Sequence, residues 1–132
     1  MPSTFTARYE ATARSVAVVR NQMAALARDW GLDECAVNDV KLAVSEATTN
    51  ALIHGYRGGD GTIRVEARIT GGELLIAVAD DGLGMQPRTD SPGLGLGLPV
   101  IASVARRFEI VEDHPGTELR MAFDCPRAAA PG

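Results

Sequence analysis

The sequence predicts an α+β fold, a two-layer sandwich in which helices pack on one face of a mixed, mostly antiparallel sheet. Segments with helical and strand periodicity follow one another in the order strand, helix, helix, hairpin, loop, helix, two strands. The 132 residues are 45% hydrophobic and 23% charged, which suits one compact domain. We place this domain at residues 1–125 and expect a disordered tail at residues 126–132.

The N-terminal part predicts a strand followed by two helices. Residues 3–12 alternate loosely between polar and apolar side chains, which favours an edge strand. Apolar side chains recur at helical spacing over residues 13–30, and Gly31 stands where a helix C′ residue is expected. Asp33 is a suitable N-cap for a second helix, which we expect to run to Gly55.

The middle of the sequence predicts a β-hairpin. Over residues 63–69 apolar side chains alternate strictly with charged ones, so one face of this strand should be covered and the other wet. Gly71 and Gly72 then form a two-residue hairpin signal. The next segment, residues 74–79, is apolar on both faces, which predicts a central position in the sheet.

The C-terminal part predicts a long loop, a helix and two strands. Residues 80–97 are rich in glycine and show neither the helical nor the strand spacing of apolar residues, so we expect a functional or disordered loop. Pro99 suits the first turn of a helix that extends to about Arg106. Residues 107–112 and 117–125 predict the closing strands.

A row of polar side chains lies within the second predicted helix. Glu46, Asn50 and His54 are spaced four residues apart, so they form one slanting row on the helix surface. A buried polar group without a partner costs on the order of 1 to 3 kcal/mol, so the row predicts a binding site. The alternative is a helix flank whose polar groups are solvated or cap nearby loops. Beside the row runs an apolar stripe of Val37, Val40, Val44, Ala47 and Ala51.

An acidic and glycine-rich segment follows the predicted central strand directly. Its pattern is Asp80-Asp-Gly82-Leu-Gly84. Glycines at these positions let backbone approach a flat ligand, while the Asp80 carboxylate accepts a hydrogen bond from an amino group. The alternative interpretation is a common Asp-Gly turn.

A second glycine-rich segment opens the last predicted helix. Residues 93–97 read Gly-Leu-Gly-Leu-Gly, and free N–H groups at a helix N-terminus attract phosphate. The segment lacks the Gly-Lys-Ser/Thr ending of a Walker loop and the spacing of the dinucleotide fingerprint. The sequence therefore excludes the usual phosphate-loop folds.

Composition excludes several classes of function. Thirteen basic and seventeen acidic residues give a net charge of -4, which does not resemble a surface for nucleic acid or anionic membranes. The sequence shows neither an apolar run long enough to span a membrane nor a signal segment, so a cytoplasmic location is expected. Cys35 and Cys125 are expected to be reduced thiols, and His54 and His114 lack the spacing of a zinc site.

The ordered series of motifs resembles the N box and glycine boxes of the GHKL superfamily of ATP-binding domains, found in histidine kinases, gyrase, Hsp90 and mismatch-repair ATPases. The series is Glu46-x-x-x-Asn50, Asp80-x-Gly-x-Gly, Gly93-x-Gly-x-Gly and Gly116-Thr117. This resemblance implies the Bergerat-type ATP-binding fold. The form Ser-Glu-Ala-x-x-Asn-Ala-x-x-His-Gly-Tyr around Asn50 is most similar to the anti-sigma-factor serine/threonine kinases of the RsbW and SpoIIAB type.

The resemblance implies roles for individual residues. Glu46 would be the general base, and Asn50 would coordinate Mg²⁺. Asp80 would hold the adenine amino group of ATP, supported by Thr117. The remaining nucleotide contacts would come from Gly82 and Gly84 beneath the base and from Gly93, Leu94, Gly95, Leu96 and Gly97 at the phosphates.

Three further positions belong to the implied nucleotide site. His54 matches a position often occupied in the family, although a helix-end histidine can instead bond nearby backbone. Met85 begins a segment, ending at Pro92, that is short for the family's ATP lid. Arg88 is the cation available there, and it can equally be a solvated loop residue.

The implied function is an Mg-ATP-dependent anti-sigma factor that sequesters a sigma factor and phosphorylates an anti-sigma-factor antagonist, in stress-response regulation of transcription. One alternative is a nucleotide-gated binding module without phosphotransfer. Another is a detached histidine-kinase catalytic domain. The family also implies a homodimer that uses N-terminal surface, but the expected exposure of Arg14, Arg20 and Arg28 supports no specific assignment.

Overall fold

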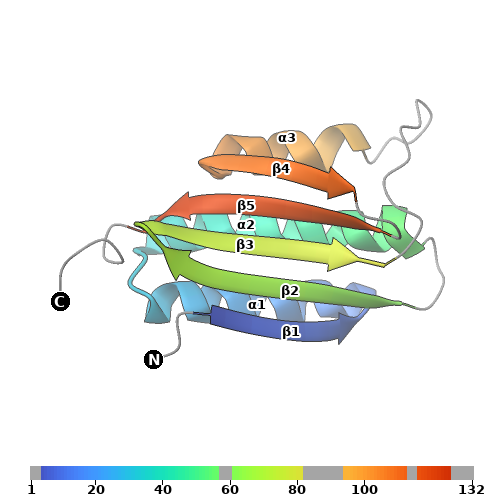
Figure 1. The fold of residues 1–132 in the computed structure, drawn as a ribbon, viewed down its shortest axis with the longest axis horizontal. Coiled ribbons are helices and arrows are strands. Elements are labelled where there is room, and N and C mark those ends of the chain that lie inside the picture. The colour runs from blue at the N-terminus through green and yellow to red at the C-terminus, as the bar shows by residue number, and fades with distance from the viewer. Residues whose placement is uncertain (1–3, 57–60, 82–93, 113–115, 126–132) are drawn as a thin grey trace.

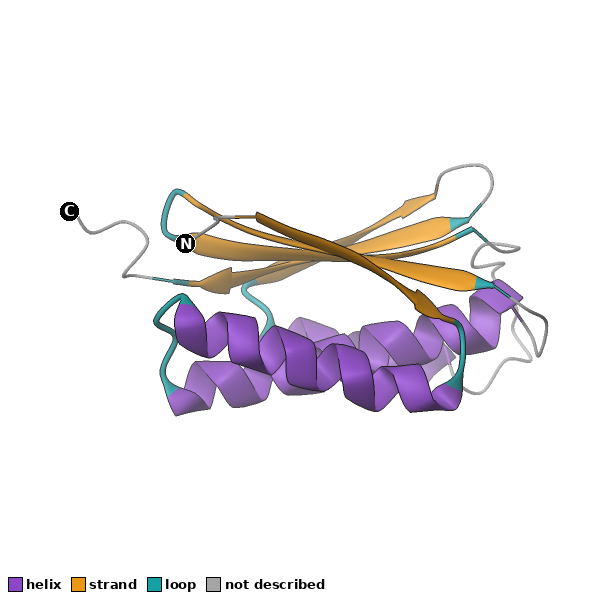
Figure 2. Ribbon diagram, turned by 90° about the horizontal axis from the view of Figure 1, so that it is seen from below, coloured by secondary structure: helices purple, strands orange, loops and turns teal. Residues whose placement is uncertain are grey.

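The described residues form a layer of helices against a five-stranded sheet (Figures 1 and 2). The structure is a computed structural model that describes residues 4–56, 61–81, 94–112 and 116–125. Its strand order is β1-β2-β3-β5-β4, and each neighbouring pair is antiparallel. This arrangement confirms the predicted α+β sandwich and the central position of β3. The elements are β1 (Thr4–Glu10), α1 (Ala13–Asp29), α2 (Glu34–Asn50), the π-helix η1 (Ala51–Tyr56), β2 (Thr62–Thr70), β3 (Glu73–Asp80), α3 (Leu94–Val104), β4 (Arg107–Glu112) and β5 (Thr117–Asp124).

Local signals in the sequence set the ends of the first elements. The Asp33 carboxylate accepts a hydrogen bond from the Ala36 N–H at 2.9 Å, which is the predicted N-cap of α2. Gly31, just after α1, has a φ of 97°, as expected of a C′ glycine. Gly71 and Gly72 also have positive φ, at 55° and 83°, which matches the two-residue hairpin between β2 and β3.

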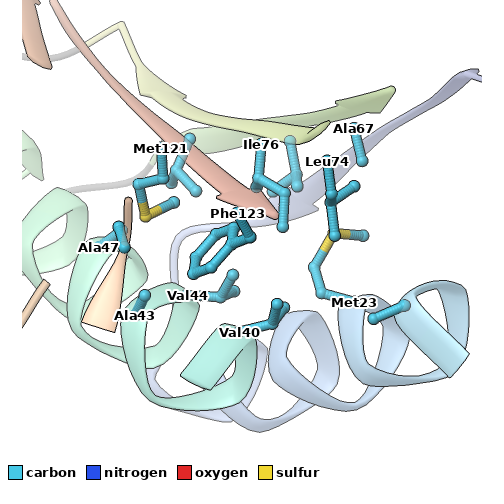
Figure 3. Packing of buried hydrophobic residues seen from close by; sticks show 14 of the residues in the cluster. Met23, Val40, Ala43, Val44, Ala47, Ala67, Leu74, Ile76, Met121 and Phe123 are labelled. Carbon is cyan, nitrogen blue, oxygen red and sulfur yellow. The ribbon is translucent and has the colours of Figure 1, made fainter. Parts of the chain in front are cut away.

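The hydrophobic core lies between the helices and the sheet face that they cover. Val44 of α2 and Phe123 of β5 face each other across this layer, with Ile76 of β3 nearby (Figure 3). Alternate strand residues enter the core because successive side chains point to opposite faces. Burial of this apolar surface, at roughly 25 cal/mol per Å², fixes α2 against β3 and β5. The C-terminal end of α2 is thereby held at one end of the sheet.

The prediction of one continuous α-helix to Gly55 is wrong. The α-helix ends at Asn50, and η1 continues the chain as a π-helix. π-Helical turns are rare and are frequently found at functional sites. A stretch of this length has no periodic signature of its own, so the sequence pattern did not distinguish it. The row of Glu46 and Asn50 is α-helical, whereas His54 lies in the π-helix.

The prediction of a loop through Gly97 is also wrong, because α3 begins at Leu94. Pro99 therefore lies inside the helix, where it cannot donate the usual backbone hydrogen bond. Ile101 is fully buried, and Leu98 packs against the core. Tertiary packing of α3 onto α2 offsets the poor helix propensity of glycine and proline. None of the described helices is both long and apolar enough to cross a membrane.

An ion-pair cluster joins the start of β3 to the start of β4. The Glu73 carboxylate accepts hydrogen bonds from Arg107, one of them at 2.8 Å, and Arg106 lies 3.7 Å away. The hydrogen bonds from Arg107 lower the pKa of Glu73. A carboxylate whose folded pKa is lowered contributes stability above its unfolded pKa, and this stability is lost as pH falls through the folded pKa.

Replacing Glu73 with glutamine should therefore flatten the acid end of the stability profile. We expect the Glu73→Gln variant to be less stable than the native chain at neutral pH and to approach it below about pH 4, near the ordinary pKa of glutamate. Urea unfolding across this pH range measures the difference. Profiles that stay parallel at every pH would contradict this assignment.

Candidate functional site

Three buried polar side chains meet at one end of the sheet. α2 ends at Asn50, β3 ends at Asp80, and β5 begins at Thr117, which pairs directly with Asp80. Their exposed fractions are 4% for Asn50, 7% for Asp80 and 4% for Thr117. An amide, a carboxylate and a hydroxyl from distant parts of the sequence therefore share one buried location.

These polar groups line a cavity together with apolar side chains. The cavity has a volume of about 10 Å³, which is the space of about one water molecule. A purine base is larger, so these residues can form only the inner wall of a base site. Apolar walls can contact a flat ring while the carboxylate of Asp80 accepts from an amino group. The apolar lining residues are Ala47, Ala51, Val78 and Leu119.

The side-chain amide of Asn50 carries a chemical signal of its own. Its Nδ2 atom is buried and has no hydrogen-bond partner among the described residues. Such a donor costs about 1 to 3 kcal/mol unless an acceptor, such as a phosphate oxygen or water, arrives. The amide can also flip and offer its oxygen to a cation. The side chain of Asn50 therefore fits the phosphate end of a nucleotide.

A metal ion here would need ligands besides protein side chains. The described residues contain no group of three His, Cys, Asp or Glu side chains that could hold a metal. Mg²⁺ commonly takes only one or two protein ligands and completes its shell with water and phosphate oxygens. Asn50 alone is therefore compatible with Mg²⁺ only when a phosphate ligand is bound.

Replacing Asn50 with leucine should separate stability from ligand binding. We expect the variant without nucleotide to be as stable as the native chain or more stable by up to about 1 to 3 kcal/mol, because the unpartnered donor is removed. The rise in melting temperature that nucleotide causes should disappear. Thr48→Val is a matched control on the same helix, because Thr48 is buried and its hydroxyl donates to the Val44 carbonyl at 2.7 Å. A retained nucleotide shift in Asn50→Leu would refute the role of Asn50.

Glu46 lies one turn before Asn50 on α2 and is half-buried. Four residues of α-helix place it about 6 Å from Asn50 along the helix axis. It is not among the residues that line the cavity. Glu46 is therefore placed to act beside a bound ligand and not as part of the cavity wall. Its role as a general base stays a prediction.

The structure does not describe the side-chain positions of the other predicted site residues. His54 belongs to η1, and its side chain is not described. Leu94, Gly95, Leu96 and Gly97 form the first turn of α3, again without described side chains. The predicted contacts Gly82, Gly84, Met85, Arg88 and Gly93 lie outside the described residues. The structure thus brings together Asn50, Asp80 and Thr117, with Glu46 one helical turn away.

Gly116 is a supporting residue that the sequence analysis included in the Gly116-Thr117 motif without giving it a role of its own. Its φ is 110°, and a Cβ atom added there would lie 1.9 Å from the carbonyl oxygen of Asp80. A glycine is therefore required where β5 approaches the end of β3. The feature of the sequence that could have identified Gly116 as a site residue is its position directly before Thr117. Val78 and Leu119 were also missed, although each lies two residues from a predicted contact and so shares its strand face.

A larger depression, of about 760 Å³, lies on the sheet face away from the helices. Its lining includes Glu66, Ala77 and Arg120 but none of the predicted site residues. Size alone does not make it the nucleotide site, because it lacks the convergent buried polar groups found around Asn50 and Asp80.

Comparison with known proteins identifies the class to which this fold and site belong. Residues 9–123 match the family of histidine kinase-like ATPase domains. A crystal structure of the RsbU and RsbW domains of a Mycobacterium tuberculosis protein superposes with a TM-score of 0.75 at 24% identity, covering 94% of this chain. This chain spans only 32% of that longer one. The histidine kinase domain of the Erythrobacter litoralis blue-light activated kinase gives a TM-score of 0.61 at 20% identity, covering 86% of this chain and 62% of the other.

Sequence similarity narrows the class further. The anti-sigma F factor of Clostridium kluyveri is 41% identical over an alignment that covers 70% of this chain and 72% of the relative. The chain belongs to the anti-sigma F factor family of histidine kinase-like ATPase domains. The resemblance seen in the ordered motifs is thereby confirmed.

Proposed function

We propose that this protein is an ATP-binding anti-sigma factor that phosphorylates a serine or threonine of an antagonist protein. The observation that carries the proposal is the convergence of Asn50, Asp80 and Thr117 in a chain of the anti-sigma F factor family. The name of the Clostridium kluyveri relative supports binding of a sigma factor. If ATP and the antagonist alter that binding, the protein exchanges one partner for the other and so regulates transcription by partner switching.

Each side chain of the inner wall has a task that its chemistry supports. The Asp80 carboxylate accepts a hydrogen bond from the adenine amino group, and Thr117 holds the neighbouring strand in register with it. Val78 and Leu119 contact the base. The side-chain oxygen of Asn50 would hold Mg²⁺, and the ion would neutralise part of the charge on the phosphates.

Glu46 supplies the chemistry of transfer in this proposal. A carboxylate oxygen of Glu46 takes the proton from the hydroxyl group of the antagonist. The hydroxyl oxygen forms a bond to the γ-phosphorus of ATP as the bond to ADP breaks. The half-buried position of Glu46 supports access by a protein substrate.

Isothermal titration with ATP, ADP and a non-hydrolysable analogue, each with and without Mg²⁺, tests the nucleotide half of the proposal. We expect binding that depends on Mg²⁺ and that weakens by at least about tenfold in Asp80→Asn, because a charge-assisted hydrogen bond is worth about 1.5 to 3 kcal/mol. Asp81→Asn is the matched control, since Asp81 is exposed and does not line the cavity. The absence of binding at millimolar nucleotide would overturn the proposed function.

A further inference from the structure

The solvent-facing side of α2 carries exposed apolar side chains before and after Glu46. Among the described residues, four large apolar side chains are exposed: Val18, Leu42, Ile53 and Ile110. The exposed fraction is 44% for Leu42 and 48% for Ile53. A single exposed leucine is ordinary on a protein surface. Two of the four on one line with the proposed general base indicate a use in the reaction.

Helical spacing places these side chains in one stripe. Leu42 precedes Glu46 by four residues, and Thr49 follows Glu46 by three. Ile53 follows Thr49 by four residues, just past the end of α2. Side chains three and four residues apart are neighbours on a helix surface. Val44 is fully buried and points from the opposite side of α2 into the core (Figure 3). We call Leu42, Glu46, Thr49 and Ile53 the outer stripe.

The outer stripe is apolar except for one carboxylate. The hydroxyl of Thr49 donates a hydrogen bond to the Ser45 carbonyl at 2.8 Å, so this hydroxyl needs no polar partner from outside. Glu46 is the one charged residue of the stripe. Asp39, one turn before Leu42, ends the apolar surface on that side. A segment that docks here therefore meets apolar surface on both sides of the Glu46 carboxylate.

The distances along the stripe match the spacing of residues in a bound segment. In the proposed reaction the acceptor hydroxyl must come within about 2.6 to 3.2 Å of the Glu46 carboxylate to lose its proton. Leu42 lies one turn from Glu46, about 6 Å along the helix axis, and Ile53 lies roughly two turns away on the other side. Successive residues of an extended chain are about 3.4 Å apart, so residues two or three positions from the acceptor reach Leu42 and Ile53.

We propose that Leu42 and Ile53 dock the antagonist by contacting aliphatic side chains that flank its acceptor serine or threonine. This inference rests on the proposed function, because it concerns the surface around the base of that reaction. The apolar contacts exclude water from the Glu46 carboxylate and the attacking hydroxyl. Charged residues beside the acceptor would lose water without gaining a partner, so such a segment binds poorly. The substrate class is a protein segment in which a hydroxyl side chain lies between aliphatic ones.

Steady-state kinetics on the full chain test the proposal, with the protein that accepts labelled γ-phosphate from the native chain as substrate. Leu42→Gln and Ile53→Thr remove apolar surface at exposed positions. We expect each variant to raise the KM for that protein about fivefold, because each loses the burial of part of an aliphatic side chain. The kcat should stay within about twofold of the native value, because Glu46 and the inner wall of the nucleotide site are unchanged.

Two further variants serve as controls. Leu42→Met keeps an apolar side chain of similar volume, so its KM should match the native value. Ile110→Thr is the matched control for Ile53→Thr, because Ile110 is also exposed but lies on the edge strand β4. Circular dichroism and titration with ATP establish that each variant folds and keeps its nucleotide site.

Mass spectrometry of the phosphorylated protein gives a second measurement that does not depend on any variant. Aliphatic residues should lie within about three positions of the acceptor on both sides. An acceptor with only polar or charged residues at these positions overturns the inference.

The outcomes separate this inference from the proposed function. An unchanged KM in Leu42→Gln and Ile53→Thr, or an equal rise in Ile110→Thr, overturns the docking role and leaves the proposed function intact. Variants that keep the KM but lose binding to a sigma factor, or lose self-association, assign the outer stripe to that occupant and also overturn the docking role. A native chain that transfers phosphate to no protein overturns the proposed function itself.

Discussion

Replacing Glu46 with alanine is expected to lower phosphoryl transfer to an antagonist protein by a factor of about 10² to 10⁴, which is the usual contribution of a general base. Nucleotide affinity should change little, because Glu46 does not line the cavity formed by Asn50, Asp80 and Thr117. Transfer of labelled γ-phosphate and titration with ATP analogues measure the two quantities on the same preparation. Glu46→Gln keeps the size of the side chain without the base and should behave like the alanine variant.

The same experiment separates the alternative functions. A nucleotide-gated binding module would show no transfer before or after the Glu46→Ala change, and its partner affinity would respond to nucleotide in both. A detached histidine-kinase catalytic domain would produce acid-labile phosphohistidine on a separate phosphoacceptor. An acid-stable product that disappears with Glu46 would exclude both alternatives.

Replacing Gly116 with alanine is expected to cost about 3 kcal/mol or more of folding free energy and to abolish nucleotide binding. The added Cβ would lie 1.9 Å from the Asp80 carbonyl oxygen, so β5 and the end of β3 must separate. The φ of 110° adds backbone strain for any residue with a side chain. A loss of about 3 kcal/mol stands at the upper end of the usual range for single substitutions.

Gly71→Ala is the matched control for the Gly116 prediction. Gly71 also has a positive φ, of 55°, but nothing lies within 4 Å of an added Cβ. Only the backbone strain of about 1 to 2 kcal/mol should remain, and nucleotide binding should persist. Chemical denaturation compares the two variants. Equal losses of stability would show that the contact with Asp80 is not what requires glycine at residue 116.

The sequence was sufficient for the parts of the fold that have strong local signals. Asp33, Gly31 and the Gly71-Gly72 pair each perform the capping or turn role predicted for them. It was insufficient where tertiary packing overrides propensity. The burial of Ile101 extends α3 through glycines that read as a loop, and the π-helix after Asn50 has no pattern that marks it.

Local motifs in the sequence also predicted individual residues of the candidate site, but not how those residues pair in the sheet. Asp80 ends a strand two residues before Gly82, and Thr117 begins a strand directly after Gly116, so sequence motifs locate both residues. Their direct pairing depends on β5 lying next to β3, which no local pattern states. The need for glycine at residue 116 follows from that pairing and could be recognised only from the structure.

The placement of β5 between β3 and β4 also has a consequence for how the protein folds. β3 and β5 are neighbours in the sheet but are separated along the chain by α3 and β4. Their pairing must close a long loop, whose entropic cost precedes any gain from the contact. We therefore expect Asp80 and Thr117 to come together late in folding, after the hairpin of β2 and β3 has formed. A nucleotide bound against this strand pair would slow unfolding without accelerating folding.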